Sequence, residues 1–209
     1  FDLLEIETNH GGMSGCRGQA ADFIILGIGG AAKVYQGRLK GKPVAIKMIW
    51  SLDITASDVL QFRDEVAMLA RLSSHSGIIQ ILGFSVFPPS LCIIMELCTR
   101  GSLLQVISEW REAQEQRFEV LSSNNPLYGG HEREGSWAMR LRLACECSEA
   151  IAFLHSQRIM HKDIKSANFL VTYTNDSRDL TIRLSDLGSA MEQIMQLSSS
   201  HSGQSSMIS

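Results

Sequence analysis

The chain has 209 residues, 44% apolar and 20% charged, a globular composition that excludes disordered, collagen-like and disulfide-scaffold classes. Its formal net charge of −3 provides no basic excess for binding nucleic acid, and no apolar run is long enough to span a membrane. Five cysteines without a Cys-x-x-Cys pair argue against a disulfide framework or zinc ribbon and favour a reducing, cytoplasmic setting.

The first half of the chain is expected to be mainly β. Residues 1–20 lack periodicity and are rich in glycine, which predicts a flexible lead-in. Segments 23–26, 33–39 and 44–49 predict an antiparallel meander, and segments 78–84 and 91–97 predict two more strands. Helical periodicity covers 56–72, where Thr55 and Asp58 form a candidate capping box. Residues 21–98 are therefore expected to form a five-stranded antiparallel sheet with one helix.

The second half, residues 99–190, is expected to be mainly helical. The Gly101-Ser102 break opens a short helix, and the polar stretch 112–136 predicts an inserted loop. Residues 137–155 predict an amphipathic helix whose apolar stripe runs from Leu143 to Leu154. Two short strands are predicted at 169–173 and 180–184, and the serine-rich end, 191–209, is expected to be disordered.

A glycine-rich stretch lies between the first two predicted strands. Gly27, Gly29 and Gly30 nearly match a Gly-x-Gly-x-x-Gly phosphate loop, with Ala32 in the third glycine position. In a dinucleotide-binding domain a helix must follow this loop, whereas a strand is predicted here, so a dinucleotide oxidoreductase is disfavoured. A glycine loop between strands can offer backbone N–H groups to phosphates. From this stretch alone, an ordinary hairpin turn is an equal alternative.

Two opposite charges are predicted to point inward from neighbouring elements. Lys47 is the only charged residue in the strand segment 44–49, and a lone ammonium there needs an anion. Glu65 falls on the apolar face of the helix that follows. Pairing would satisfy both groups and aim Lys47 at a ligand phosphate. A purely structural ion pair is the alternative.

The most specific pattern lies in the second half, as His161-Lys162-Asp163-Ile164-Lys165-Ser166-Ala167-Asn168 followed by Ser185-Asp186-Leu187-Gly188. With the glycine loop, the strand lysine and the helix glutamate, these segments match in order the motif set of the eukaryotic protein kinases. Over residues 22–190 the chain resembles that family. The Lys165-Ser166 pair, the Arg100-Gly101-Ser102-Leu103 turn, and Trp137 before Arg140 look most like its tyrosine-kinase-like group, which mostly phosphorylates serine and threonine.

The resemblance implies an α+β bilobal fold, with an N-lobe over 21–98 and a partial C-lobe over 99–190. It implies an enzyme that transfers the γ-phosphoryl group of Mg-ATP to Ser/Thr hydroxyls of protein substrates. The implied site comprises catalytic residues Asp163, Lys165, Lys47 and Glu65; nucleotide-binding residues Leu26, Gly27, Gly29, Gly30, Val34, Ala45, Lys47, Met95, Glu96 and Cys98; and Mg²⁺ ligands Asn168 and Asp186.

The resemblance also assigns roles within this site. Asp163 would orient the substrate hydroxyl and accept its proton, while Lys165 would steady the γ-phosphoryl group. Adenine would bond to the backbone of Glu96 and Cys98, with Met95 as gatekeeper. The residues expected to form an apolar stack that couples the helix to the metal-binding aspartate are Leu69, Ile81, His161 and Leu187, and His161 is expected to be a packed core histidine.

Several departures from the family pattern are visible. Ala31 and Ala32 replace the aromatic tip and the third glycine of the loop. Lys162 replaces the arginine that grips an activation-loop phosphate, which argues against that mode of control. Few residues follow Asp186 and none forms an Ala-Pro-Glu motif, so we expect an incomplete, poorly active catalytic domain. A nucleotide-binding pseudokinase or scaffold is the alternative function.

Overall fold

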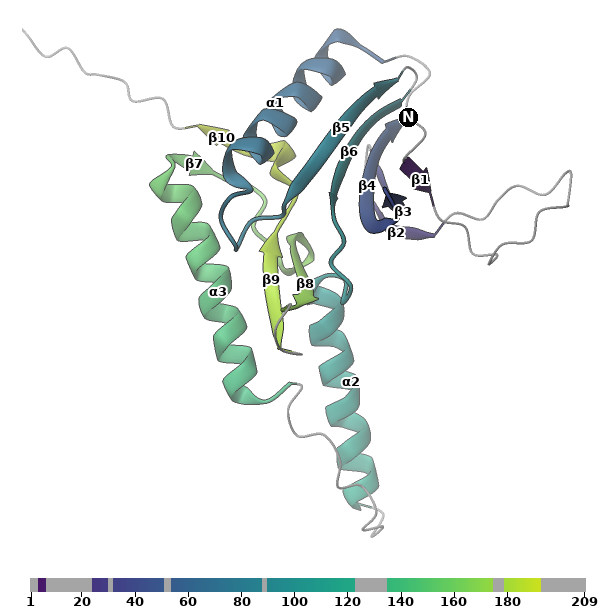
Figure 1. The fold of residues 1–209 in the computed structure, drawn as a ribbon. Helices are drawn as coiled ribbons and strands as arrows, with labels where there is room; N and C mark the ends of the chain where they lie inside the picture. Colours follow the sequence, from purple (N-terminus) through teal and green to yellow (C-terminus); the bar gives the residue numbers. More distant parts are fainter. Residues whose placement is uncertain are drawn as a thin grey trace, which may run out of the picture.

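The computed structural model describes residues 4–6, 24–29, 32–50, 54–87, 90–122, 135–174 and 179–192. These residues form a sheet with one long helix, followed by two long helices beside a small hairpin (Figure 1). None of the helices in these ranges has the length and apolar character needed to cross a membrane.

The first part is a six-stranded antiparallel sheet in the order β1-β3-β4-β6-β5, with β2 also paired to β3. Lys40 and Gly41 join β3 to β4 in a two-residue turn with φ of 52° and 76°, the left-handed values that tight hairpins favour. Strands β2 to β6 correspond to the five predicted strands, but β2 continues through Gly27 to Ile28, beyond the predicted end at Leu26. The bounds are β1 Leu4–Ile6, β2 Ile25–Ile28, β3 Lys33–Leu39, β4 Lys42–Trp50, β5 Ile81–Phe87 and β6 Ser90–Glu96.

Strand β1 corrects the expectation of a flexible lead-in. Leu4–Ile6 pairs antiparallel with β3, Leu4 opposite Leu39. Three residues are too few to show an alternating pattern, and this strand depends on a free edge of β3 that only the folded sheet provides. The expectation for residues 1–20 is therefore wrong at β1, and the rest of that stretch lies outside the described residues.

Strand β5 also begins later than expected. The prediction starts at Ile78, whereas β5 starts at Ile81. The Ile79 N–H donates to the carbonyl of Leu184 at 3.0 Å, and Leu184 N–H donates to Gly77 O at 2.7 Å. Residues 77–79 therefore pair with the second half of the chain instead of with the sheet.

Helix α1 (Ala56–Leu72) begins and ends as predicted. Asp58 N–H donates to Thr55 Oγ1 at 3.2 Å and Thr55 N–H donates to the Asp58 carboxylate at 2.8 Å, which forms the expected capping box. Phe62, Glu65 and Leu69 are among its buried side chains. A carboxylate on this apolar face requires a partner from another element.

The second part contains α2 (Leu103–Ser122), α3 (Trp137–Ser156) and the hairpin of β8 (Phe169–Tyr173) and β9 (Leu180–Leu184). Helix α3 and both hairpin strands match their predicted ranges, and α3 packs against β9. The short strands β7 (Ile159–Met160) and β10 (Met191–Glu192) pair antiparallel.

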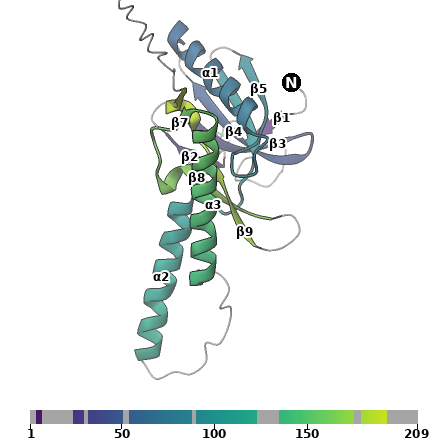
Figure 2. The same cartoon turned by 90° about the vertical axis from the view of Figure 1, so that its left-hand side faces the viewer.

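Helix α2 corrects the prediction of an inserted loop over 112–136, because it continues to Ser122. The segment is polar but contains no glycine or proline before residue 123, and Arg111 pairs with Glu115 one turn later at 2.9 Å. Polar residues are compatible with a helix where it leaves the protein core, and the end of α2 does so (Figure 2). Residues 123–134 lie outside the described ranges.

One apolar core joins the two parts. It includes Leu69 from α1, Ile93 from β6, Leu154 from α3 and Ile182 from β9, all at most 1% exposed. A second cluster includes Val44 and Ile46 of β4. Because side chains alternate along a strand, these two residues lie on the opposite face of the sheet from Ala45 and Lys47. The shared core therefore holds α1, the sheet and the β8–β9 hairpin in fixed relative positions, which determines the site described next.

Candidate active site

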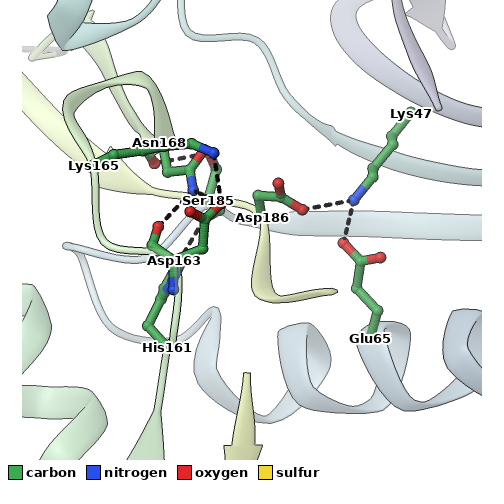
Figure 3. A network of polar contacts seen from close by, with 8 residues as sticks. All are labelled: Lys47, Glu65, His161, Asp163, Lys165, Asn168, Ser185 and Asp186. Carbon is green, nitrogen blue, oxygen red and sulfur yellow. Dashed lines mark hydrogen bonds and ion pairs between the residues drawn. The ribbon is translucent and has the colours of Figure 1, made fainter. Parts of the chain in front are cut away.

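Three charged residues from distant parts of the chain meet beside α1 (Figure 3). The Lys47 ammonium on β4 lies 2.6 Å from Glu65 Oε1 on α1 and 3.0 Å from Asp186 Oδ1, just after β9. The side chains of Lys47 and Glu65 are 16% and 6% exposed, whereas that of Asp186 is 49% exposed. The predicted pair is therefore present, and it joins a third residue at an open edge.

The charge on Lys47 is stabilised by its partners. Burial by itself lowers the pKa of Lys47, but the negative charges of Glu65 and Asp186 and their hydrogen bonds outweigh it and leave the pKa above its ordinary value of 10.5. Lys47 is thus an ammonium at neutral pH, held in place before any ligand arrives.

Asp186 has an unusual backbone conformation. Its φ of 57° and ψ of 66° lie in the left-handed region, which costs a non-glycine residue roughly 1 kcal/mol or more. The next residue, Leu187, is buried in the core. The turn at Asp186 therefore carries its carboxylate toward Lys47 while the following side chain anchors the segment.

The second group lies on the loop between β7 and β8. Lys165 Nζ donates to Asp163 Oδ2 at 2.7 Å, and Asn168 Nδ2 donates to Asp163 O at 2.8 Å and to its Oδ2 at 3.0 Å. The hydrogen bond from Lys165, followed by that from Asn168, holds the pKa of Asp163 below its ordinary value. Asp163 is consequently a carboxylate at neutral pH, and the Asn168 amide has a defined orientation with Oδ1 turned from Asp163.

His161 supports this loop from the core. It is 3% exposed, its Nδ1 accepts the Asp163 N–H at 3.3 Å, and its Nε2 lies 3.1 Å from Ser185 O. Because Nδ1 is an acceptor, the ring proton lies on Nε2 and donates to Ser185. His161 is a packed, hydrogen-bonded histidine, as expected. Of its predicted neighbours, Leu69 and Leu187 belong to one core cluster, with Ile81 packed against it.

The predicted nucleotide residues lie along the sheet and at its junction with the second part. Ala45 on β4 pairs with Met95 on β6, and Met95 and Cys98 are buried. Burial raises the pKa of the Cys98 thiol to about 12, so the thiol is uncharged at neutral pH. The Glu96 N–H donates to Gln80 O at 3.0 Å, and its carboxylate accepts from Arg183 Nε at 3.2 Å.

Gly27 lies within β2, opposite Val34 on β3, and Gly29 directly follows the strand. Gly29 N–H donates to Ala32 O at 2.8 Å. Among the described residues, no heavy atom other than those of its chain neighbours lies within 4 Å of where a Cβ of Gly27 would be. Leu26 is exposed and Val34 is half-buried opposite Lys47. Gly30 and Ala31 lie outside the described residues.

Sequence reasoning missed one residue at the centre of the site. Ser185 donates both its N–H, at 2.8 Å, and its hydroxyl, at 2.9 Å, to the carbonyl of Asn168. The only sequence signal is a hydroxyl residue directly before Asp186. Its partner, seventeen residues earlier, is defined only by the β8–β9 hairpin.

The family model described as "Protein kinase domain" matches residues 22–206. The chain belongs to the protein kinase family. The predicted kinase fold class is confirmed by this match together with the antiparallel sheet and helices. Members of this family generally use ATP and Mg²⁺ and act on protein substrates. The tyrosine-kinase-like subgroup and the predicted incompleteness stay predictions.

Several curated proteins are similar to this kinase domain. "Probable serine/threonine-protein kinase SIS8" of Arabidopsis thaliana is 32% identical over 177 residues, covering 83% of this chain and 15% of the relative. "Serine/threonine/tyrosine-protein kinase HT1" of the same plant is 30% identical, covering 78% and 36%. "Probable serine/threonine-protein kinase drkD" of Dictyostelium discoideum is 29% identical, covering 70% and 10%. The chain therefore spans only 10 to 36% of the length of these relatives.

Proposed function

We propose that this kinase domain transfers the γ-phosphoryl group of ATP to serine or threonine hydroxyls of protein substrates. The observation that carries the proposal is the bridge of Lys47 between Glu65 and Asp186, at 2.6 and 3.0 Å. In this bridge Lys47, the cation proposed to bind phosphate, contacts Asp186, whose carboxylate is suited to a metal ion. The names of the similar proteins support serine and threonine as acceptors.

The residues fit a bound Mg²⁺ shared with a nucleotide. Asn168 and Asp186 offer amide and carboxylate oxygens, the hard donors that Mg²⁺ prefers. Such an ion would take its other ligands from phosphate and water. When bound, Mg²⁺ neutralises charge on the triphosphate.

The nucleotide is proposed to lie between the sheet and the second part. Lys47 contacts the α- and β-phosphates, with Glu65 fixing its direction. Gly27, within β2, and Gly29, directly after it, are proposed to cover the phosphates. The adenine ring packs against apolar side chains and bonds to backbone at the junction, where the proposed contacts are Leu26, Val34, Ala45, Met95, Glu96 and Cys98. Gly30 is also proposed to bind the nucleotide.

Asp163 is proposed to orient the substrate and take its proton. The substrate oxygen forms a bond to the γ-phosphorus, the bond from that phosphorus to the bridging oxygen of ADP breaks, and the hydroxyl proton passes to an Asp163 carboxylate oxygen. The ionised state of Asp163 suits this role. Lys165, whose Nζ lies 2.7 Å from Asp163 Oδ2, is proposed to steady the transferring group. Positioning and charge account for most of the expected rate.

The test is transfer of labelled phosphate from Mg-ATP to casein by the chain and by Asp163→Asn. Removing the acceptor carboxylate is expected to lower the rate by about 10²- to 10⁴-fold. Asp64→Asn is the matched control, because Asp64 is an exposed aspartate paired with Arg63 on α1, and it should transfer at the wild-type rate. If wild type and Asp163→Asn give equal low counts while binding ATP, the chain is a nucleotide-binding scaffold.

A further inference from the structure

Ser185 is the residue between strand β9 and Asp186, and all its polar groups are engaged. Its N–H and its hydroxyl both donate to Asn168 O, at 2.8 and 2.9 Å. Its own carbonyl lies 3.1 Å from His161 Nε2. A carbonyl oxygen has two lone pairs, so Asn168 can accept both bonds at once. Ser185 is thus attached to Asn168 by two bonds and to His161 by a third.

This arrangement extends the β8–β9 hairpin by one step. The paired register ends with Phe169 opposite Leu184. Asn168 and Ser185 are the next residues on each side, and their bonds continue the pairing beyond the strands. One residue proposed to hold Mg²⁺, Asn168, therefore belongs to this extended pairing. The other, Asp186, directly follows Ser185, the partner of Asn168. Figure 3 shows Ser185 between them.

The backbone changes direction directly after this step. Asp186 has φ 57° and ψ 66°, which turns the chain away from the hairpin. The position of Ser185, the last residue before this turn, therefore decides where the Asp186 carboxylate lies. The bond from the backbone N–H to Asn168 O does not depend on serine, since every residue except proline has this N–H. The hydroxyl adds a second bond to the same acceptor, and it is the part that depends on serine.

We propose that Ser185 is a positioning residue whose hydroxyl fixes the separation of Asn168 and Asp186 for a divalent cation shared with the nucleotide. The inference rests on the proposed nucleotide site. Ser185 touches neither nucleotide nor metal in this scheme, and it acts through the two residues that would.

The variants are chosen to change one hydroxyl at a time. Ser185→Ala removes the hydroxyl and keeps the N–H bond. Ser185→Thr keeps a hydroxyl at the same position. Ser148→Ala is the matched control, because Ser148 Oγ also donates to a backbone carbonyl, that of Ala144, at 2.9 Å on the exposed side of α3.

The measurement is binding of a fluorescent ATP analogue to the chain as the Mg²⁺ concentration is varied, with thermal unfolding recorded for each variant. Ser185→Ala is expected to need about fivefold more Mg²⁺ for half-maximal binding, the effect of losing one neutral hydrogen bond. Ser185→Thr and Ser148→Ala should match the wild type. Affinity for the analogue without Mg²⁺ should be equal in all four proteins.

Three results would overturn the inference. The first is that Ser185→Ala shows the same Mg²⁺ dependence as Ser148→Ala. The second is that Ser185→Ala loses as much affinity for the analogue without Mg²⁺ as with it. The third is that Ser185→Thr, with an unchanged melting temperature, does not show the wild-type Mg²⁺ dependence. Failure of the proposed function is distinguishable, because a Mg²⁺ shift without phosphate transfer by the wild type rejects transfer alone. Absence of any Mg²⁺-dependent nucleotide binding rejects both.

Discussion

The two halves of the site contain ion pairs of nearly equal length in different surroundings. Lys47 and Glu65 are 2.6 Å apart with side chains 16% and 6% exposed, whereas Lys165 and Asp163 are 2.7 Å apart with side chains 53% and 37% exposed. Breaking a buried pair leaves an uncompensated charge, while an exposed pair contributes little to stability. The buried pair, Lys47 and Glu65, therefore stabilises the fold. The exposed pair, Lys165 and Asp163, can separate at little cost, so that each residue can contact a substrate instead.

The largest expected effect comes from removing one charge of the buried half. Lys47→Met leaves Glu65 buried without its partner and is expected to lower the free energy of unfolding by about 3 kcal/mol, measured by urea denaturation. It should also abolish phosphate transfer. Lys47→Met with Glu65→Gln should recover most of the stability without activity. Wild-type stability in the single variant would show that the pair is not structurally coupled.

The exposed half should show the opposite behaviour. Asp163→Asn is expected to keep the free energy of unfolding within about 0.5 kcal/mol of wild type while phosphate transfer is lost. The same urea series checks this. A loss of stability as large as that of Lys47→Met would remove the distinction between the halves.

A smaller effect is expected from the helix that carries Glu65. Thr55→Ala removes one half of the capping box and should cost about 1 kcal/mol of unfolding free energy. Ser57→Ala, an exposed change in the first turn of α1, is the control and should be neutral. Thermal unfolding of the two variants decides, and equal melting temperatures would show that the cap does not stabilise α1.

The smallest effect concerns the titration of the exposed half. Asp163 titrates below the ordinary value of 3.8, chiefly because Lys165 donates to its carboxylate. Since its pKa is lower folded than unfolded, this stabilisation is present above about pH 4 and is lost as the pH falls through the folded pKa. Lys165→Met should move the Asp163 pKa upward, measured by carboxyl-carbon NMR. An unmoved pKa would exclude Lys165 as its main cause.

Prediction from the sequence succeeded where a local periodic pattern is present and failed where none marks the residues. The period of three and four residues defined α1 and placed Glu65 on its buried face, and β8 and β9 match the two short strands predicted there. The end of α2 was missed because its polar sequence has no apolar stripe to follow. Ser185 was missed because a single hydroxyl has no periodicity.

By itself, the sequence determined most of the helices and strands, which charged side chains point inward, and, through its motifs, the family. Only the tertiary structure decided that Lys47 meets Asp186, 139 residues later, and that Ser185 joins Asn168. The physical reason is that periodicity reports the face on which a side chain lies. The partner opposite that face depends on how α1, the sheet and the β8–β9 hairpin pack on their common core.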